Sequence, residues 1–452
     1  MPSSPTAVLL TDAARRAAAY LDGLDTRPVA PSPDAVSALR ALDGPLPKTG
    51  ADPAAVLEEL DRLISPATMA MAGPRFFGFV IGGALPATLA ANVLASAWDQ
   101  NSAKWAATPG TAALEKVALR WTLEALGLPL EAGGGFGTGA TVANFTALAA
   151  ARHAVLARAG WDVEARGLFG APPITVVVGA EAHVSVLKAL AMLGLGRERL
   201  VTVPVDGQGR LRPDALPPLR PPAIVCLQAG NVNTGAFDPA PAVIARAREA
   251  GAWVHVDGAF GLWAAAAPRR AHLTEGMADA DSWATDAHKW LNVPYDSGLA
   301  LVRDDAALRA AMGISAAYLP EAGARDPADS TPELSRRARG VEVWAALRNL
   351  GRSGLADLVE RTCRHAERFA DGLSAASHQV LNDVVLNQVL VSFGDDERTR
   401  RVIAGLQADG TCWCGGTVWQ GKTAMRISVS SWATTEDDVE RSLAAMLRVA
   451  RS

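Results

Sequence analysis

The sequence has no long run of uncharged apolar residues. None of its 452 residues lies in a stretch of about 18 such residues, the length that a helix needs to cross a bilayer, so we expect no membrane contact. Neither charge is in excess: 43 Lys and Arg stand against 47 Asp and Glu. A nucleic-acid partner is therefore not expected. Arg15 and Arg16 follow the first apolar stretch instead of preceding it, which predicts an amphipathic helix and not a signal peptide.

Cysteine is scarce as well. Four Cys residues in so long a chain form no disulfide framework, and they favour a reducing, cytoplasmic location. Cys412 and Cys414 are separated by a single residue. In zinc knuckles about two to four residues usually separate the two ligands of a pair, and a second pair of ligands is needed, so we expect no metal. We interpret the two cysteines as residues of a strand.

The rest of the composition is that of a globular protein, with 49% hydrophobic and 20% charged residues. A chain of this length predicts two or three subdomains. Residues 1–70 are expected to form an N-terminal arm of helices joined by proline-bearing loops. Residues 71–355 are expected to form a large domain, and residues 356–452 a small C-terminal α+β domain.

Short β-rich runs alternate with intervals that are long enough for helices between residues 174 and 303. The expected strands are Ile174–Ala180, Leu200–Val205, Ala223–Gln228, Trp253–Gly258, Ser282–His288 and Gly298–Arg303. Such alternation predicts an α/β fold with a mostly parallel sheet covered by helices.

Polar side chains stand at or just after the ends of four of these runs, and ligands of parallel sheets bind beyond the carboxyl ends of the strands. The residues are Glu181 and His183, then Asn231, Asn233 and Thr234, then Asp257, and finally Asp286, His288 and Lys289. Each has a simpler explanation alone, as a helix cap, a core histidine or a surface lysine. Their expected convergence on one edge of the sheet favours a ligand site.

A glycine-rich stretch at residues 131–139 precedes an apolar, helix-forming stretch that starts near Thr141. The free amides and the positive dipole at a helix start bind phosphate. We expect Gly139, Ala140 and Thr141 to hold one. A dinucleotide is not expected, because its fingerprint requires a β-strand immediately before the glycines, and we predict none there.

A phosphate site, a strand-end carboxylate and a lysine together suggest pyridoxal 5′-phosphate (PLP). Lys289 would form a Schiff base, the internal aldimine, with its aldehyde, and Asp257 would keep its pyridine nitrogen protonated. His183 would stack on the ring. The predicted catalytic residues are therefore Lys289, His183 and Asp257. The predicted cofactor-binding residues are Gly139, Ala140, Thr141, His183, Asn233, Asp257, Asp286, His288 and Lys289.

The chain resembles the group II PLP-dependent decarboxylases of fold type I, the family of the aromatic amino acid and glutamate decarboxylases. The matching runs, in family order, are GPRFFGFV, TGATVANFTALAAAR, EAHVSVLKA, VHVDGAFG, DAHKWLNVPYDSG and MRISVSSWATTEDDVE. The resemblance implies a transferase-like large domain, a small domain and a homodimer, with the N-terminal arm packed on the partner and the active site at the subunit interface. It also implies decarboxylation of an L-amino acid to the amine.

The chain departs from the family pattern in a loop that usually carries a proton-donating tyrosine. The segment that corresponds to this loop, Glu321–Glu333, has none. In relatives without it the amino acid is converted to an aldehyde with oxygen. That oxidative outcome, or a carbon–carbon lyase, therefore stands beside decarboxylation, and His183 or Tyr318 is a candidate proton donor.

The substrate is less well specified by the sequence. The apolar segment Phe76–Pro86 corresponds to the family's substrate entrance, although it could equally be dimer core. Four arginines could meet a substrate carboxylate or form structural ion pairs: Arg336, Arg337, Arg339 and Arg426.

Overall fold

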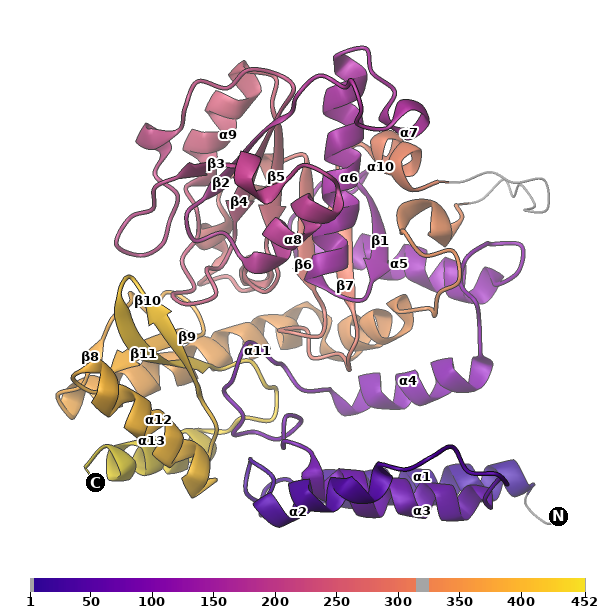
Figure 1. The fold of residues 1–452 in the computed structure, drawn as a ribbon, viewed down its shortest axis with the longest axis vertical. Coiled ribbons are helices and arrows are strands. Elements are labelled where there is room, and N and C mark those ends of the chain that lie inside the picture. Colours follow the sequence, from indigo (N-terminus) through magenta and orange to yellow (C-terminus); the bar gives the residue numbers. More distant parts are fainter. Residues whose placement is uncertain (1–3, 314–324, 452) are drawn as a thin grey trace.

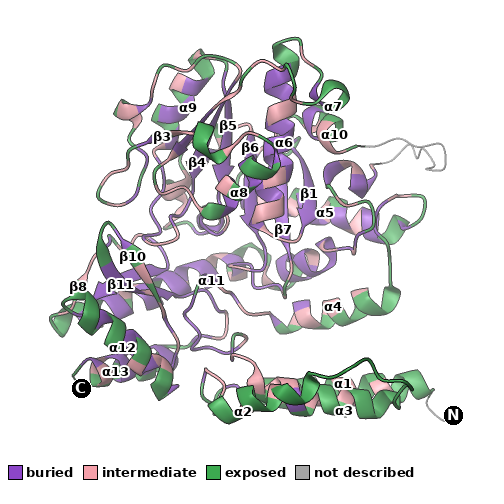
Figure 2. Cartoon of the chain, viewed as in Figure 1, coloured by how far each residue is buried: buried purple, intermediate pink, exposed green. Residues whose placement is uncertain are grey.

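The computed structural model describes residues 4–313 and 325–451. Three helices form the N-terminal arm: α1 (Pro5–Asp22), α2 (Pro33–Ala38) and α3 (Pro53–Ile64). Each begins with a proline, and a serine or aspartate just before it caps the first turn. Helices α1 and α3 lie side by side, away from the rest of the chain, and most of their surface is exposed (Figures 1 and 2).

The large domain is built on a seven-stranded sheet with the order β1-β7-β6-β5-β4-β2-β3. Its strands are β1 (Gly133–Gly137), β2 (Thr175–Gly179), β3 (Val201–Val203), β4 (Ala223–Gln228), β5 (Trp253–Asp257), β6 (Ser282–Asp286) and β7 (Gly298–Val302). Strands β2 to β6 pair in parallel, and only β7 runs antiparallel to its neighbours. The predicted mostly parallel α/β sheet is confirmed.

Strand β1 was not expected, because its sequence is GGGFG. Its glycines allow neighbouring segments to pack directly against the strand backbone. A Cβ atom added at Gly133 would lie 2.1 Å from Asp305 Oδ1, and one at Gly135 would lie 2.0 Å from the carbonyl oxygen of Ser330. Neighbouring segments thus approach the backbone too closely for a side chain. The prediction that no strand precedes the glycine-rich helix start was wrong for this reason.

Helices cover both faces of this sheet (Figure 1). The helices of this domain are α4 (Pro86–Trp98), α5 (Pro109–Ala125), α6 (Ala140–Arg158), α7 (Val163–Arg166), α8 (Val184–Met192), α9 (Ala240–Glu249) and α10 (Asp305–Met312), of which α4 lies away from the sheet. Alternate strand residues belong to different apolar clusters: Val225 and Val254 to one, Ile224 and Cys226 to the other. Both faces of the strands are therefore buried, which explains their continuous apolar runs.

The C-terminal region contains an antiparallel sheet with the order β10-β11-β9-β8. Its elements are α11 (Gly340–Ala375), β8 (Gln379–Val380), β9 (Gln388–Ser392), α12 (Asp396–Asp409), β10 (Gly415–Trp419), β11 (Lys422–Ser428) and α13 (Glu436–Arg451). Helix α11 links the two sheets and is kinked at Gly351. The boundary predicted between residues 355 and 356 falls inside this helix, just after the kink.

Cys412 and Cys414 lie just before β10 and not in a strand, and both are packed in the apolar core of the small domain. All four cysteines are free and buried. Within the described ranges, no helix combines the length and apolarity that a membrane crossing requires.

Candidate active site

The polar ends of β5 and β6 lie next to each other in the sheet. Asp257 is the last residue of β5, and Asp286 is the last residue of β6, with His288 and Lys289 two and three positions later. The two strands pair in parallel. His183 caps the start of α8, which follows β2. Parallel strand order therefore brings these groups to one edge of the sheet, as predicted.

The amine of Lys289 is held by a buried carboxylate. Its Nζ lies 3.0 Å from Asp286 Oδ2. The second oxygen of that carboxylate, Oδ1, is buried and has no hydrogen-bond partner among the described residues. A buried polar atom without a partner is costly in a folded protein, so this position favours a ligand that supplies a donor.

Asp257 is a buried carboxylate whose hydrogen-bond donors, in the part of the chain that the structure describes, are all neutral. Its oxygens accept hydrogen bonds from the Ala259 amide at 3.2 Å, Asn144 Nδ2 at 3.3 Å and Ser185 Oγ at 3.5 Å. Burial raises the pKa of Asp257, and the nearby His183 and Lys289 side chains oppose that rise. A cationic ligand placed against this carboxylate would stabilise its charged form. The protonated nitrogen of a pyridine ring fits this requirement.

His183 presents a neutral, flat ring beside Asp257. Its Nδ1 accepts the Ser185 amide at 3.2 Å and lies 2.8 Å from Ser185 Oγ, which fixes the ring. Burial is the largest effect on the pKa of His183 and lowers it, so the imidazole is neutral near pH 7. A fixed neutral ring is suited to stacking on an aromatic cofactor.

The start of α6 has the features of a phosphate site. Gly139 precedes the helix and has no capping side chain, so the first amides of α6 are free for a ligand. A Cβ at Gly139 would lie 3.1 Å from His288 Cε1, so the glycine lets His288 approach the helix start. His288 Nδ1 accepts the Ser297 amide at 3.0 Å, which leaves Nε2 as the donor of the neutral ring. Ala140, Thr141 and His288 thus offer donors to a phosphate.

Asn233, another predicted cofactor ligand, makes its side-chain contact with the small domain. Its Oδ1 accepts a hydrogen bond from Thr417 of β10 at 3.2 Å. Glu181 likewise accepts from Trp419 of the same strand and from Asn231, each at 3.0 Å. These strand-end residues therefore join the large domain to the β10–β11 hairpin.

Sequence reasoning missed Asn144, Ser185 and His255. Asn144 lies in the first turns of α6, and both Asn144 and Ser185 contact Asp257. His255 lies two positions before Asp257 in β5 and bonds to Asn144. The available signal was a lone polar residue in an alanine-rich helix, and a histidine on the same face of a buried strand as the strand-end acid.

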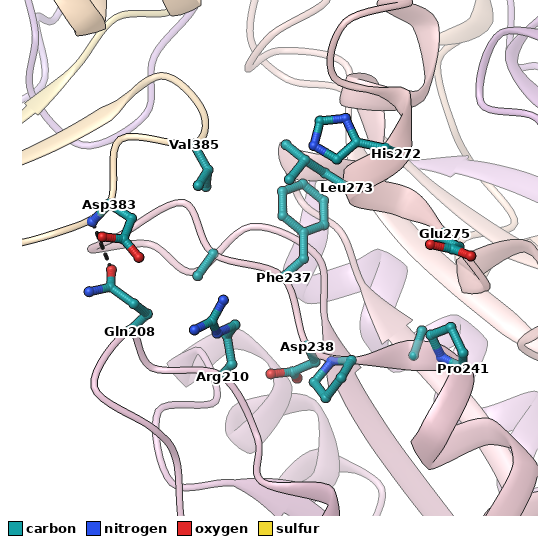
Figure 3. A pocket seen from close by; sticks show the side chains of 13 residues that line it. Gln208, Arg210, Phe237, Asp238, Pro241, His272, Leu273, Glu275, Asp383 and Val385 are labelled. Carbon is teal, nitrogen blue, oxygen red and sulfur yellow. Dashed lines mark hydrogen bonds between the residues drawn. The ribbon is translucent and has the colours of Figure 1, made fainter.

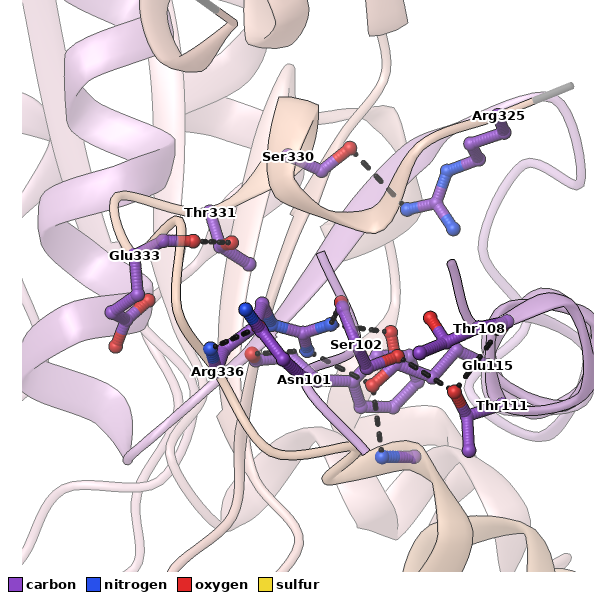
Figure 4. A network of polar contacts seen from close by, with 12 residues as sticks. Asn101, Ser102, Thr108, Thr111, Glu115, Arg325, Ser330, Thr331, Glu333 and Arg336 are labelled. Atoms are coloured by element: carbon purple, nitrogen blue, oxygen red, sulfur yellow. Dashed lines mark hydrogen bonds and ion pairs between the residues drawn. The ribbon is translucent and has the colours of Figure 1, made fainter. Parts of the chain in front are cut away.

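Three of the four candidate arginines form structural ion pairs. Arg336 is fully buried and binds Glu115 through two hydrogen bonds of 2.8 and 2.9 Å (Figure 4). Arg337 pairs with Glu342, and Arg339 pairs with Asp296 at 3.0 Å. The structural alternative therefore holds for these three.

Arg426 of β11 has different surroundings. It is half-buried, and its Nη1 donates to the Val232 carbonyl at 3.1 Å. The described residues offer it no carboxylate partner. Burial lowers the pKa of Arg426, and its charge in turn lowers the pKa of His183, which places it within electrostatic reach of the site.

The apolar segment Phe76–Pro86 is partly core and partly exposed. Phe76 and Phe77 are buried, whereas Phe79 is 57% exposed. The Leu85 amide bonds to the carbonyl of Asn292 at 2.8 Å, which holds the segment against the loop that follows Lys289. The segment therefore has a part that is packed in this chain's own core and a part that is exposed, and both interpretations of it stay predictions.

The predicted loop Glu321–Glu333 is described only from residue 325 onward, and Tyr318 lies outside the described residues. In the described part, Asp326 bonds to the Trp105 amide at 2.7 Å and pairs with Lys104 at 3.0 Å. This part of the loop is therefore anchored to the segment after α4.

A separate pocket of about 220 Å³ lies between the large sheet and the C-terminal region (Figure 3). Arg210, His272 and Asp383 are among its lining residues, and the Asp383 amide bonds to Gln208 Oε1 at 2.9 Å. None of the predicted site residues lines it. It is therefore distinct from the site around Lys289.

Known proteins resemble this chain over most of its length. Residues 37–394 match the family model described as the pyridoxal-dependent decarboxylase conserved domain. L-2,4-diaminobutyrate decarboxylase of Rhizobium meliloti is 30% identical over 429 residues, which cover 90% of this chain and 84% of that protein. Phenylacetaldehyde synthase of Arabidopsis thaliana is 25% identical over 415 residues, covering 85% and 83%.

The fold also has close relatives among solved structures. The crystal structure of Oryza sativa TDC with PLP and tryptamine superposes with a TM-score of 0.91 at 24% sequence identity, covering 100% of this chain and 99% of that one. The expected fold-type I architecture, with its large and small domains, is thereby confirmed.

Proposed function

The chain belongs to the family of pyridoxal-dependent decarboxylases, and we propose that it removes the carboxyl group of an L-amino acid and releases the corresponding amine. It is a PLP-dependent enzyme. The proposal rests chiefly on one observation: a lysine and a buried carboxylate without a cationic partner, Lys289 and Asp257, follow neighbouring parallel strands.

Bound PLP supplies an aldehyde that reacts with amines and a protonated ring that takes up the electron pair left when a bond at the substrate's α-carbon breaks. Lys289 would supply the amine that holds the aldehyde. Asp257 would keep the ring nitrogen protonated, and His183 would offer a flat ring for stacking. The amides at Ala140 and Thr141, with His288, would hold the phosphate.

Arg426 is the proposed contact for a carboxylate of the substrate. A half-buried guanidinium with one carbonyl partner keeps most of its donors free for an anion. The exposed ring of Phe79 belongs to the segment Phe76–Pro86, which borders the loop after Lys289 through Leu85. These two groups would orient the amino acid by its charge and by its apolar side chain.

Oxidative conversion of the amino acid to an aldehyde is the second candidate. Two observations favour it: the described part of the loop, residues 325–333, has no tyrosine, and a relative is named phenylacetaldehyde synthase. Without an acid positioned to protonate the α-carbon, oxygen can react there instead.

A product assay separates the two reactions. The PLP-loaded enzyme is mixed with a panel of L-amino acids while carbon dioxide, oxygen and ammonia are followed. Decarboxylation predicts one carbon dioxide and one amine per substrate, with no oxygen consumed. Oxygen uptake with equal ammonia release would replace the decarboxylase proposal by the oxidative one. Lys289→Ala is the control, since it keeps the pocket but removes the amine, and borohydride reduction followed by peptide mapping identifies the linked residue.

We also propose that two copies of the chain form a homodimer with the active site at their interface. Helix α1 buries none of its residues and α3 buries only Leu63, whereas Val8, Val56 and Leu60 are exposed by 52% or more. A second copy would cover this apolar surface. Analytical ultracentrifugation of the wild-type chain should give a dimer, and Val56→Asp with Leu60→Asp should shift it toward monomer. A monomeric wild type would reject the proposal.

The division into an arm (1–70), a large PLP-binding domain (71–355) and a small domain (356–452) remains a proposal, with α11 crossing the second boundary. A cytoplasmic location is also proposed, and the four free, buried cysteines are compatible with it.

A further inference from the structure

A chain of hydrogen bonds leads from the interior of the large domain to the carboxylate of Asp257. Trp253 Nε1 donates to Ser282 Oγ at 2.9 Å, and Ser282 Oγ lies 2.9 Å from His255 Nδ1. His255 Nε2 lies 2.8 Å from Asn144 Oδ1, and Asn144 Nδ2 donates to Asp257 Oδ2 at 3.3 Å. All five residues are buried.

The donors in this chain all point the same way. The Trp253 indole can only donate, and the amide oxygen of Asn144 can only accept. Burial lowers the pKa of His255 to about 3, so its ring is neutral and carries a single N–H. That hydrogen is on Nε2, facing Asn144, and Nδ1 accepts the hydroxyl hydrogen of Ser282. The amide of Asn144 is thereby fixed with its NH₂ group toward Asp257.

We propose that His255 is a positioning residue of the cofactor site, which acts through Asn144 to keep Asp257 ionised and in one orientation for the ring nitrogen of PLP. The proposal rests on the role assigned to Asp257 above. His255 itself does not contact Asp257. Its effect comes from holding the oxygen end of the Asn144 amide, whose Nδ2 also donates to Ser185 Oγ at 3.3 Å. Aligned hydrogen bonds strengthen one another inside a protein.

The test compares how tightly the apoenzyme binds two ligands: PLP and its 1-deaza analogue, in which a C–H group replaces the ring nitrogen. Only PLP can pair with the Asp257 carboxylate, so the ratio of the two dissociation constants measures that contact. Equilibrium dialysis gives both constants without any turnover. The wild-type protein should prefer PLP, and Asp257→Asn should abolish the preference.

Substitutions at His255 then form a matched set. His255→Leu removes both ring nitrogens and should reduce the preference for PLP about tenfold, the value of one hydrogen bond to a charged group. His255→Gln places its side-chain N–H about where Nε2 lies and should keep most of the preference. His255→Asn has the same amide on a shorter side chain, cannot reach Asn144, and should behave like the leucine variant.

The outcomes separate the two ideas. If the leucine and asparagine variants bind both ligands with the wild-type ratio, His255 is only structural and the proposal fails. If His255→Leu does not fold, Ser282→Ala takes its place and should lower the ratio about threefold, with an unchanged ratio counting against the proposal. If the wild-type protein itself shows no preference for PLP, the role of Asp257 is wrong and the inference falls with it.

Discussion

Two arginines of this chain, Arg336 and Arg426, differ in what their charge meets. Arg336 is fully buried, and its guanidinium binds both oxygens of Glu115 and the carbonyls of Ser102 and Phe136. Arg426 is half-buried and bonds to one carbonyl, with no carboxylate partner among the described residues. The first charge is neutralised inside the protein, whereas the second is left open at the edge of the candidate site.

This difference distinguishes charged groups that stabilise the fold from charged groups that are available to bind a ligand. A buried charge whose partners are all protein atoms makes its contribution before any ligand binds. Arg426 has no such compensation, and the buried Asp257 has only neutral donors. The two open charges are of opposite sign, and they match the substrate carboxylate and the protonated ring of PLP.

The largest effect on stability is expected when the buried Arg336–Glu115 ion pair is broken. Arg336→Leu leaves Glu115 buried without its partner, which should lower the free energy of unfolding by about 3–5 kcal/mol. Urea unfolding of the apoenzyme measures this. The double variant Arg336→Leu, Glu115→Leu should recover much of the loss, because it removes both charges. A single variant as stable as the wild type would show that the pair does not hold the fold.

Sequence patterns predicted the parallel sheet and the site at its edge, because both follow from local rules. Continuous apolar runs indicate buried parallel strands, and the polar residues after them must meet at one edge. The ion pairs were not predictable in this way. Arg336 and Glu115 are more than two hundred residues apart in the sequence, and only the packing of the segment after residue 325 against α5 brings them together.

Strand β1 and the chain behind Asp257 were missed for related reasons. The GGGFG strand contradicts β-propensity, since close packing on both sides and not side-chain preference selects its glycines. His255 and Asn144 lie on different elements, and each alone has the pattern of an isolated polar residue in an apolar segment. Their connection is a tertiary contact, to which no sequence spacing points.

Replacing Arg426, the arginine without a carboxylate partner among the described residues, by leucine should weaken substrate binding and not folding. Arg426→Leu should leave the unfolding free energy of the apoenzyme within about 1 kcal/mol of wild type, because it breaks a single hydrogen bond. KM for the amino acid should rise about 10- to 100-fold, since a charge-assisted contact to a carboxylate is lost. Arg426→Lys, which keeps the charge, should show a smaller rise. If Arg426→Leu instead destabilises the apoenzyme as much as Arg336→Leu, the distinction between the two arginines is wrong.

A third prediction extends the comparison to a buried group that stays neutral. The pKa of His255 in the folded state, about 3, is below its ordinary value of 6.5. Below pH 6.5 the His255 side chain therefore binds a proton in the unfolded chain but not in the folded protein. The free energy of unfolding is highest above pH 6.5 and decreases as the pH falls below that value. Relative to His255→Gln, the wild type should lose about 1.4 kcal/mol for each pH unit between 6 and 4. Urea unfolding at several pH values checks the slope, and parallel curves for the two proteins would contradict it.

The smallest effect on stability should come from an arginine ion pair whose two charges are in contact but exposed to solvent. Arg352 lies 3.0 Å from Glu124, with side chains that are 76% and 35% exposed. Water already solvates both charges and salt screens them, so Arg352→Ala should change the unfolding free energy by less than about 1 kcal/mol. The change should shrink further in high salt, whereas the loss in Arg336→Leu should persist. If Arg352→Ala and Arg336→Leu lose stability equally, the distance between the charges and not their burial decides the strength of an ion pair. The contrast between Arg336 and Arg426 would then lose its physical basis.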